Sequence, residues 1–381
     1  MLQTVKFGII GAGLMGREFA SAAARWAHLM GDLPRPEIVA VCNRSAAKFD
    51  WYRANFPHIN LYTHDYRELL ARSDIDAVYV AVPHDLHEEI YCATVAAGKH
   101  LMGEKPFGID LAANQAIMKC LGDHPDVTAR CASEFPFFPA MQRICGMIES
   151  GAFGRIIEVN AAFMHSSDLD PEKPINWKRM VEINGEYGVM GDLGMHVCHV
   201  PFRAGWRPRN VRAILSDIVS ERPDGKGGRV PCRTWDNAVM LCETADQGGR
   251  VFPMTLKTHR IAPGEKNTWS FEVLGVKACA RFSTKNPKRL ELMEYKGGEQ
   301  VWQQIDTGYE AAYPTVTGGI FEFGFTDAIL QMWAAFLYEL HYKKPLKKFA
   351  GCVTPAEAAL SHKLFTAALQ SQAENATVAI D

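Results

Sequence analysis

The segment GAGLMG, at positions 11–16, constrains this chain more than any other part of its sequence. An apolar run, VKFGII (5–10), precedes the segment, and a helix-forming run follows it. A glycine-rich turn in that setting matches the G-x-G-x-x-G pattern of dinucleotide-binding domains. Gly11 would permit the tight turn, Gly13 would let a pyrophosphate approach the backbone, and Gly16 would let the helix pack on the strand. The helix N-terminus would add free N–H groups and a positive dipole end, so we expect a bound dinucleotide here.

The first part of the chain alternates between short apolar strands and helices, which is the pattern of a doubly wound parallel sheet. Strands are expected at 5–10, 37–42, 77–82 and 100–103, with helical segments between them. We therefore predict an α/β fold that begins with a Rossmann dinucleotide-binding domain over residues 1–128.

Longer strands with few helices between them dominate after residue 129, which indicates a second domain on a largely antiparallel sheet. We predict this α/β domain, with a large open sheet, over residues 129–381. Its last helix, at about 355–373, is placed so that it could pack back on the Rossmann domain. The other helices are expected at 138–150 and 327–342, and the strands at 156–165, 211–217, 237–244, 251–259, 269–274, 279–284 and 290–295.

Composition excludes several classes of partner. The 41 basic residues nearly balance the 43 acidic ones, so no net field draws the chain to nucleic acid or to an anionic membrane. No apolar stretch approaches the ~20 residues of a membrane span, and the N-terminus lacks a signal-peptide pattern. The ten cysteines form no CxxC pair, and most lie in apolar segments, as buried free thiols do. We therefore expect a cytoplasmic protein that binds a small molecule.

The end of the second predicted strand bears on the choice of dinucleotide, because an acidic residue there would bind the adenosine ribose and repel a 2′-phosphate. The residues at that point are Asn43, Arg44 and Ser45, with no carboxylate among them. Asn43 could hydrogen-bond a ribose, while Arg44 could pair with a phosphate, stack on adenine or remain a solvated loop arginine. NAD and NADP both fit this pattern, and NAD is the first choice.

The segment Gly103-Glu104-Lys105-Pro106 ends the predicted strand 100–103, at the edge of the sheet where ligands of open α/β sheets gather. Pro106 biases Lys105 toward an extended backbone, which would aim its side chain along the cleft. A lysine held there can steer an alcohol oxygen and relay its proton. Taken alone, however, the pattern favours a solvated lysine at a strand end.

The segment GDLGMHVCH (191–199) contains Asp192 and His196, which share one face of a helix because they are four residues apart. Asp192 would then lie in the first turn, where the helix dipole favours its charge. A carboxylate beside an imidazole can hold two hydroxyls of a polyol while the imidazole takes a proton. Two alternatives remain open: a metal site that uses Asp192, His196 and His199, and a purely structural helix.

GAGLMG, EKP at 104–106 and GDLGMH at 191–196 occur in the order and spacing of the Gfo/Idh/MocA oxidoreductase family, which the chain resembles over almost its whole length. GAFGR at 151–155 agrees with the resemblance. The spacing of the later segments, starting with THRIAPGEKNTW (258–269), is similar to that of levoglucosan dehydrogenases in particular.

The resemblance implies a Rossmann domain followed by a substrate-binding domain whose open sheet often forms an oligomer interface, hence a homodimer or homotetramer. It implies that Lys105, Asp192 and His196 are catalytic and line a substrate pocket beside the nicotinamide. The usual reaction is the reversible oxidation of a secondary hydroxyl on a sugar, inositol or related polyol. The chain departs from many relatives at Glu134–Phe138, where they carry an Asn or Arg contact, and at His199, where they carry an acidic residue.

Two sets of binding residues are expected from these arguments. Those at the cofactor lie in the glycine turn and at the ends of strands in the first domain: Gly11, Gly13, Leu14, Met15, Gly16, Asn43, Arg44, Ser45, Val82, Pro83, His84, His87, Glu104 and Lys105. Those at the sugar are Lys105, His165, Trp177, Lys178, Arg179, Asp192, His196 and Arg260. Trp177 would be an apolar platform for a ring, or else a core tryptophan. The cations would suit an anionic sugar or glycoside, although each one singly also fits a surface charge.

Two other functions stay open. Some members of the superfamily are NAD-dependent glycosidases, including sulfoquinovosidases. These enzymes oxidise a ring hydroxyl, eliminate the aglycone, add water and return the hydride, so that no cofactor is consumed. A non-catalytic dinucleotide-binding sensor is the third possibility, but such proteins usually lose the lysine or the base, and both are present here.

Overall fold

A computed structural model describes residues 3–307 and 311–380, which form two compact units. The first unit contains the described residues up to Phe137 together with Ala311–Ala358. The second unit contains those from Phe138 to 307 and from Ala359 onward. The domain boundary at residue 128 stays a prediction, and in the structure the late segment Ala311–Ala358 groups with the first unit.

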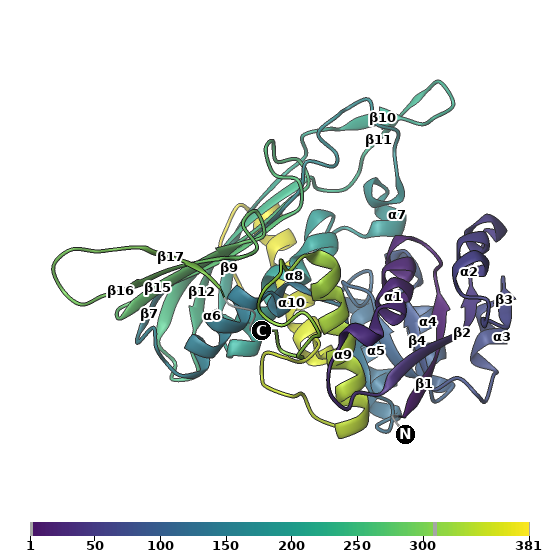
Figure 1. Ribbon diagram of the computed structural model, residues 1–381. Coiled ribbons are helices and arrows are strands. Elements are labelled where there is room, and N and C mark those ends of the chain that lie inside the picture. The colour runs from purple at the N-terminus through teal and green to yellow at the C-terminus, as the bar shows by residue number, and fades with distance from the viewer. Residues whose placement is uncertain (1–2, 308–310, 381) are drawn as a thin grey trace. The chain divides into compact units, whose positions relative to one another are not determined.

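The sheet of the first unit has six parallel strands in the order β3-β2-β1-β4-β5-β6 (Figure 1). The reversal of strand order at β1 is the switch point of a doubly wound sheet, so the predicted Rossmann fold is confirmed. Its strands are β1 (Thr4–Ile10), β2 (Arg35–Cys42), β3 (Leu61–Thr63), β4 (Ala77–Val80), β5 (His100–Gly103) and β6 (Ala129–Cys131). Its helices are α1 (Leu14–Ala24), α2 (Phe49–Asn55), α3 (Tyr66–Leu70), α4 (His87–Ala96), α5 (Leu111–Asp123) and α9 (Phe325–Tyr342).

Helix α9 joins the first unit through aromatic packing. Its Trp333 stacks on Phe19 of α1 with ring centroids 3.7 Å apart, and meets Phe7 of β1 edge-on at 5.9 Å. An ion pair between Arg25 and Asp327 ties the start of α9 to the end of α1. Because these partners are about 300 residues apart in the sequence, local patterns gave no sign of this contact.

The sheet of the second unit is large and mostly antiparallel, as predicted. Its strand order is β17-β16-β15-β14-β7-β13-β12-β9-β18, with β8 paired to β12. Within the described residues, β7–β13 is its only parallel pair. Its strands are β7 (Ile156–Met164), β8 (Arg207–Pro208), β9 (Asn210–Ser216), β12 (Asn237–Ala245), β13 (Val251–His259), β14 (Thr268–Gly275), β15 (Ala278–Ser283), β16 (Arg289–Glu294), β17 (Gln303–Asp306) and β18 (Val378–Ala379).

Helix α8 (Val189–Ala204) lies against one face of this sheet, over β7 and β13 (Figure 1). The strands alternate buried and accessible residues, so the apolar side chains of one face reach α8. Almost every residue of α8 is buried, because α10 (Pro355–Glu374) covers it on another side and Phe365 packs onto Gly194. The packing of α10 on the first unit stays a prediction. Shorter helices are α6 (Pro139–Glu149) and α7 (Val181–Asn184).

A short hairpin, β10 (Glu221–Pro223) and β11 (Arg229–Pro231), completes the second unit. Arg222 is fully buried and donates to the backbone carbonyls of Asp168, Asp170 and Lys173. The hairpin therefore holds the segment that follows β7, which carries several charged residues of the candidate site.

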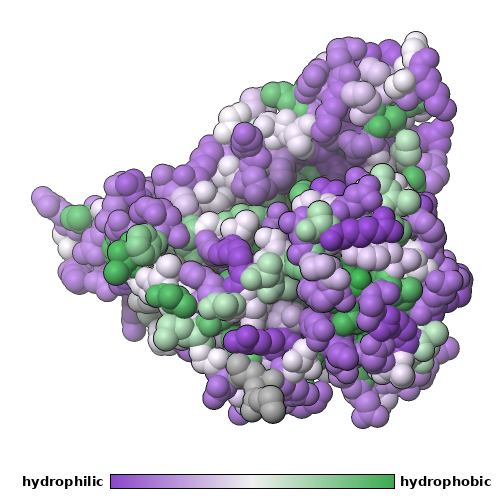
Figure 2. Space-filling view, turned by 45° about the vertical axis from the view of Figure 1, so that its right-hand side comes forward, coloured by the Kyte–Doolittle hydropathy of each residue, from purple (hydrophilic) through white to green (hydrophobic). Residues whose placement is uncertain are grey.

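The visible surface is mainly polar. On the face shown in Figure 2, apolar residues lie as separate patches between hydrophilic ones. No helix in the described part of the chain is both long and apolar enough to cross a bilayer. All ten cysteines are free thiols, and eight of them are buried, in agreement with the expectation from their sequence context.

Candidate functional site

The glycine turn has the geometry that a dinucleotide needs. Gly11 has φ +104°, and a Cβ there would overlap the carbonyl oxygen of Ala81. A Cβ on Gly16 would lie 2.8 Å from the hydroxyl of Tyr52, so this glycine permits close packing between α1 and its neighbours. A Cβ on Gly13, in contrast, would meet no atom within 4 Å. The open space at Gly13 is what close approach of a pyrophosphate requires, so these residues fit the cofactor.

A cavity of about 500 Å³ opens beside this turn. Its lining residues come from the ends of β1 to β4 and the start of α3 and α4: Ile10, Gly11, Gly13, Cys42, Asn43, Arg44, His64, Asp65, Tyr66, Arg67, Ala81, Val82, Pro83, Leu86, Glu89 and Ile90. Six of the predicted cofactor residues are among them. The cavity therefore lies at the carboxyl ends of the parallel strands, where open α/β sheets bind ligands.

Asn43 connects the glycine turn to the end of β2. Its Oδ1 accepts a hydrogen bond of 3.1 Å from the backbone N–H of Ala12, and its Nδ2 donates to the carbonyl of Ser45. The backbone carbonyl of Asn43 lies 2.7 Å from Nδ1 of His64. The amide oxygen and the amide nitrogen of Asn43 thus both hydrogen-bond backbone groups, and these bonds fix the backbone that lines the cavity.

Four lining residues that the sequence did not single out, His64 to Arg67, follow the short strand β3. The Arg67 guanidinium lies 3.1 Å from the carboxylate of Glu89, which also accepts a hydrogen bond from Tyr66. Strand β3 has only three residues, so its carboxyl end was hard to place from the sequence. The alternation of strands and helices along the first unit was the one signal that could have indicated the end of β3.

His84 and His87 are buried after β4. The backbone N–H of Gly108 donates to His87 Nδ1 at 3.4 Å, so Nε2 carries the proton and donates to the carbonyl of Val82 at 3.1 Å. The His87 ring also stacks on Tyr91 with centroids 4.7 Å apart. These contacts give His87 a structural role in shaping the turn at Val82.

Lys105 follows β5 and is half-buried. Glu104 beside it is buried, and its Oε1 accepts a hydrogen bond of 2.6 Å from the hydroxyl of Tyr79. Its carbonyl accepts another, of 2.7 Å, from Tyr91. The two tyrosines anchor Glu104, which fixes the backbone that carries Lys105.

Substituting the glycines separately tests the turn. In Gly13→Ala, the new methyl group enters open space, so we expect thermal stability to change by less than about 1 kcal/mol while dinucleotide affinity falls at least about tenfold. In Gly11→Ala, the positive φ and the overlap with Ala81 should cost about 1–3 kcal/mol of stability as well. Calorimetry of the ligand-free protein and titration with NAD and NADP measure both. Unchanged affinity in Gly13→Ala would show that the dinucleotide does not lie over this turn.

In the second unit, the predicted helix around Asp192 is confirmed as α8, and Asp192 lies in its first turn. Helix α8 starts after Gly188, whose φ of +56° and close approach to Trp235 leave no room for a side chain. Lys178 donates to both carboxylate oxygens of Asp192 at 3.0 Å, and Arg260 donates to Oδ2 at 2.6 Å. Asp192 is therefore held by two cations in one orientation.

This ion pair belongs to a larger network. Arg260 lies 3.9 Å from Asp168, which also pairs with Lys173 at 2.9 Å and Arg179 at 3.8 Å. Burial raises the pKa of Asp168, but the hydrogen bond from Lys173 and the charges of Arg260 and Arg179 outweigh it, so the pKa lies below its ordinary value. The network that the described residues form contains four cationic side chains and three carboxylates, the third being Asp236.

Arg179 and Arg260 do not reach the surface. Arg179 is fully buried and pairs with Asp236, and Arg260 is 2 % exposed. Both are predicted substrate-binding residues, and in the structure both pair with buried carboxylates, Arg260 with Asp192 and Arg179 with Asp236. Lys178 is half-buried and its Nζ lies 5.7 Å above the ring of Trp177. Nothing in the sequence pattern indicated Asp168 or Asp236.

His196 follows Asp192 by one turn of α8. Its ring meets Phe163 edge-on at 5.3 Å, and Phe163 also contacts the ring of His165 at 4.7 Å. The indole of Trp269 donates to the carbonyl of His196 at 3.0 Å. The second unit thus brings Asp192 and His196 together with Lys178, Arg260 and, through Phe163, His165. Among the residues the structure describes, no group of three or more His, Cys, Asp or Glu could hold a metal ion.

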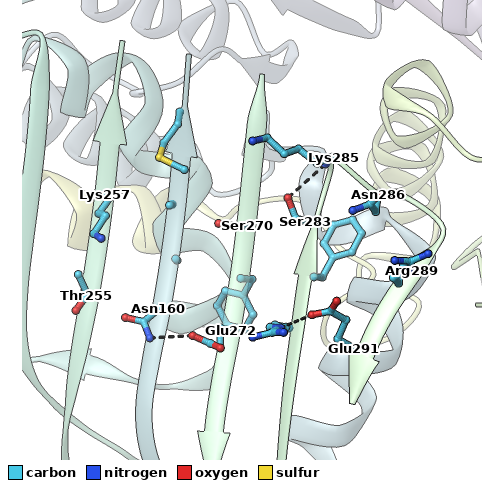
Figure 3. A pocket seen from close by; sticks show the side chains of 16 residues that line it. Asn160, Thr255, Lys257, Ser270, Glu272, Ser283, Lys285, Asn286, Arg289 and Glu291 are labelled. Carbon is cyan, nitrogen blue, oxygen red and sulfur yellow. Dashed lines mark hydrogen bonds and ion pairs between the residues drawn. The ribbon is translucent and has the colours of Figure 1, made fainter. Parts of the chain in front are cut away.

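A second cavity, of about 630 Å³, lies on the open face of the large sheet (Figure 3). Its side chains come from five neighbouring strands and pair across them, as Asn160 does with Glu272 and Arg281 with Glu291. Lys257 and Arg289 add further positive charge. This surface has no carboxylate–imidazole pair like that on α8.

Two family models match the chain. The model described as an oxidoreductase family with an NAD-binding Rossmann fold matches residues 5–129. The model described as the GFO/IDH/MocA C-terminal domain matches residues 141–281.

Curated relatives include several sugar enzymes. Levoglucosan dehydrogenase of Pseudarthrobacter phenanthrenivorans is 27% identical over 307 residues, 76% of each chain. Glucose-6-phosphate 3-dehydrogenase of Bacillus subtilis is 24% identical over 296 residues, 76% of this chain and 77% of the relative. Glycosyl hydrolase family 109 protein 1 of Bacteroides thetaiotaomicron is 27% identical over 190 residues, 46% of this chain and 38% of the relative. A solved structure of levoglucosan dehydrogenase with NADH covers the whole chain with a TM-score of 0.87 and 23% identity.

Proposed function

Because this chain belongs to the Gfo/Idh/MocA oxidoreductase family, we propose that it oxidises a ring hydroxyl of a sugar or glycoside with a nicotinamide dinucleotide. The observation that carries the proposal is the buried carboxylate and imidazole on α8, those of Asp192 and His196. Lys178 and Arg260 both donate hydrogen bonds to the Asp192 carboxylate. Sugar dehydrogenases among the relatives support the same class of substrate.

The cofactor would bind in the cavity beside the glycine turn. Gly13 and the N-terminus of α1 would hold the pyrophosphate, and Arg44 would stack on the adenine or pair with a 2′-phosphate. The bound nicotinamide supplies the hydride acceptor. We take NAD as the first choice, and because no carboxylate stands at residues 43–45, the assay compares it directly with NADP.

The protein's part in the reaction is to orient the hydroxyl and to remove its proton. His196 and Lys105 would take the proton, since an imidazole and an amine are the basic groups among the proposed catalytic residues. Asp192 would accept a hydrogen bond from the neighbouring hydroxyl, in the orientation that Lys178 and Arg260 impose. Arg179 and Arg260 are positioning residues in this scheme, while Trp177 and His165 would contact the sugar.

A second candidate function is a glycosidase that oxidises its substrate only transiently. The relative from glycosyl hydrolase family 109 favours it. The surplus of cations around Asp192, with Lys173 and Lys178 half-exposed, would suit an anionic glycoside. In this scheme the same residues would act, but the hydride would return to the product.

Measuring how much reduced cofactor forms for each sugar molecule converted separates the two functions. Purified protein is incubated with NAD or NADP and a panel of neutral and anionic pyranoses and their chromogenic glycosides. A dehydrogenase forms one reduced cofactor per oxidised sugar, whereas the glycosidase releases the chromophore without net reduction. We expect stoichiometric reduction. Chromophore release without it would replace the first proposal by the second, and neither signal on any sugar would contradict both.

We also propose that the open face of the large sheet joins copies of the chain in a homodimer or homotetramer. Polar and charged side chains line the cavity shown in Figure 3, with Lys257 and Arg289 as cations and Glu272 and Glu291 as carboxylates. Such a mixture of signs can pair with itself about a two-fold axis. Light scattering of the purified protein measures the oligomeric state.

A further inference from the structure

Glu134 is a buried acidic residue near the proposed catalytic lysine. It follows β6, the parallel neighbour of β5, and precedes a short turn at Phe135–Phe137. Gly103 pairs with Cys131 in the register of these strands, and the N–H of Ala132 donates to the carbonyl of Gly103 at 2.9 Å. Glu134 therefore lies at the same carboxyl edge of the sheet as Lys105.

The surroundings of Glu134 are unusual for an acidic residue. Its side chain is 5 % exposed, and that of Glu104 is 7 % exposed. The pKa of Glu134 is raised to about 8, mainly by burial and in addition by the charge of Glu104, while a backbone hydrogen bond and the charge of Lys105 oppose the rise. A carboxyl group that changes charge near neutral pH beside a lysine is equipped to exchange protons with it.

We propose that Glu134 is the proton acceptor of Lys105, a positioning residue that returns the lysine to its neutral form after each oxidation. The inference rests on the proposed function, in which Lys105 takes a proton from the sugar hydroxyl. The observation behind it is the juxtaposition of a buried carboxyl and the lysine at the ends of two paired strands.

The proton steps balance as follows. The O–H bond of the sugar breaks as the neutral amine of Lys105 takes the proton, and the carbon–hydrogen bond breaks as the hydride reduces the oxidised nicotinamide. The sugar carbon is thereby oxidised to a carbonyl. The Lys105 ammonium then gives a proton to the Glu134 carboxylate, which becomes a neutral carboxyl group and releases the proton to solvent.

Other titratable groups lie on the elements around this pair and must be considered in any pH profile. Elements around Glu134 in the first unit contribute Tyr79 on β4, Glu104 and Lys105 after β5, Arg130 and Cys131 on β6, Glu339 on α9, and Glu357 at the start of α10. Arg130 is occupied by Glu339, and Tyr79 by Glu104. Burial raises the pKa values of Tyr79 and Cys131 well above their ordinary values, and the charge of Glu104 raises them further. These two groups therefore stay neutral through the range near pH 8.

The variant Glu134→Gln tests the proposal through the pH dependence of turnover. At pH 6 the wild-type carboxyl is already neutral, so we expect nearly equal kcat values in the two proteins. Above pH 8 only the wild type has a carboxylate, so the variant should fall behind by about tenfold or more. The exposed Glu88→Gln variant is the control and should follow the wild type throughout. A loss that is the same at every pH would mean a merely structural role and overturn the proposal.

A second measurement needs neither cofactor nor sugar. Infrared difference spectra of the ligand-free protein should show a carboxylic acid band that disappears with a midpoint near pH 8 in the wild type and is missing in Glu134→Gln. Absence of that band in the wild type overturns the proposal even where sugar oxidation is intact. If the band titrates as expected but no sugar is oxidised, the proposed function fails and the relay fails with it.

The pH dependence of the stability of the wild type and Glu134→Gln independently checks that folding raises the pKa of Glu134. In the folded protein Glu134 keeps its proton up to about pH 8, while in the unfolded chain it loses it near the ordinary value of 4.5. Unfolding therefore releases a proton between these values, and the wild type loses stability as the pH rises through this window. We expect the melting temperature of Glu134→Gln to rise relative to the wild type over the same window. Parallel curves would contradict the burial of an ionisable group.

Discussion

Replacement of Lys105 with methionine is expected to lower kcat/KM for sugar oxidation by about 10²–10⁴-fold. The substitution keeps most of the side-chain volume and removes the amine that would accept the hydroxyl proton. Lys105 is half-buried at the end of β5, and Tyr79 and Tyr91 hold the adjacent Glu104, so the backbone should stay in place. Steady-state kinetics with the sugar found in the panel measure the effect.

The control is Lys119→Met, which removes an exposed lysine from α5 of the same unit and should leave the kinetics unchanged. A double variant, Lys105→Met with His196→Asn, asks whether the two residues serve the same hydroxyl. If they do, the double variant falls little further than the worse single variant, because groups that act as a unit are not additive. Full activity in Lys105→Met would contradict the catalytic assignment.

Replacement of Arg179 with methionine is expected to lower the free energy of unfolding by about 3–5 kcal/mol. Arg179 and Asp236 are both fully buried, so the variant leaves a carboxylate in the interior without its cation. Two backbone N–H groups, of Ile218 and Val219, still donate to Asp236, but they carry no full charge. Urea denaturation of the ligand-free protein measures the change.

The matched control is Arg233→Met. Arg233 pairs with Glu182 at 3.1 Å, but both side chains are more than 60 % exposed, so we expect a change of about 0–1 kcal/mol. Arg179 also lies near Asp168, which pairs with Arg260, and Arg260 in turn pairs with Asp192. Loss of Arg179 should therefore disturb the orientation of Asp192 and reduce kcat. Equal stability in the two variants would show that the buried pair has an unrecognised replacement cation.

Parts of the site that depend on neighbours in the sequence could be predicted. Gly11 forms the tight turn and Gly16 the close packing that their positions indicated, and Gly13 has the open space that a pyrophosphate would need. Asp192 and His196 lie on one helix, where their spacing of four puts them on the same face, because the period of a helix is a local property. The parallel sheet of the first unit likewise followed from the alternation of apolar strands and helices, although its count of six strands did not.

Residues whose partners are distant in the sequence could not be placed in this way. Arg260 and Asp192 are 68 residues apart, and Arg179 and Asp236 are 57 apart. No periodicity relates such positions, so the sequence did not indicate that these arginines pair with buried carboxylates. The same reason hid the contact of Trp333 with Phe19, which places α9 in the first unit.

Patterns among neighbouring residues were therefore enough to predict three features of this protein: a glycine turn for a dinucleotide, a parallel sheet, and a carboxylate and an imidazole on one helix. The folded chain decided which charges are buried, which of them hold Asp192, and how far the pKa of Glu134 moves. The physical reason is that propensity and periodicity act over a few residues. Burial and Coulomb interactions depend instead on distances in space, which become defined only when strands far apart in the sequence pair.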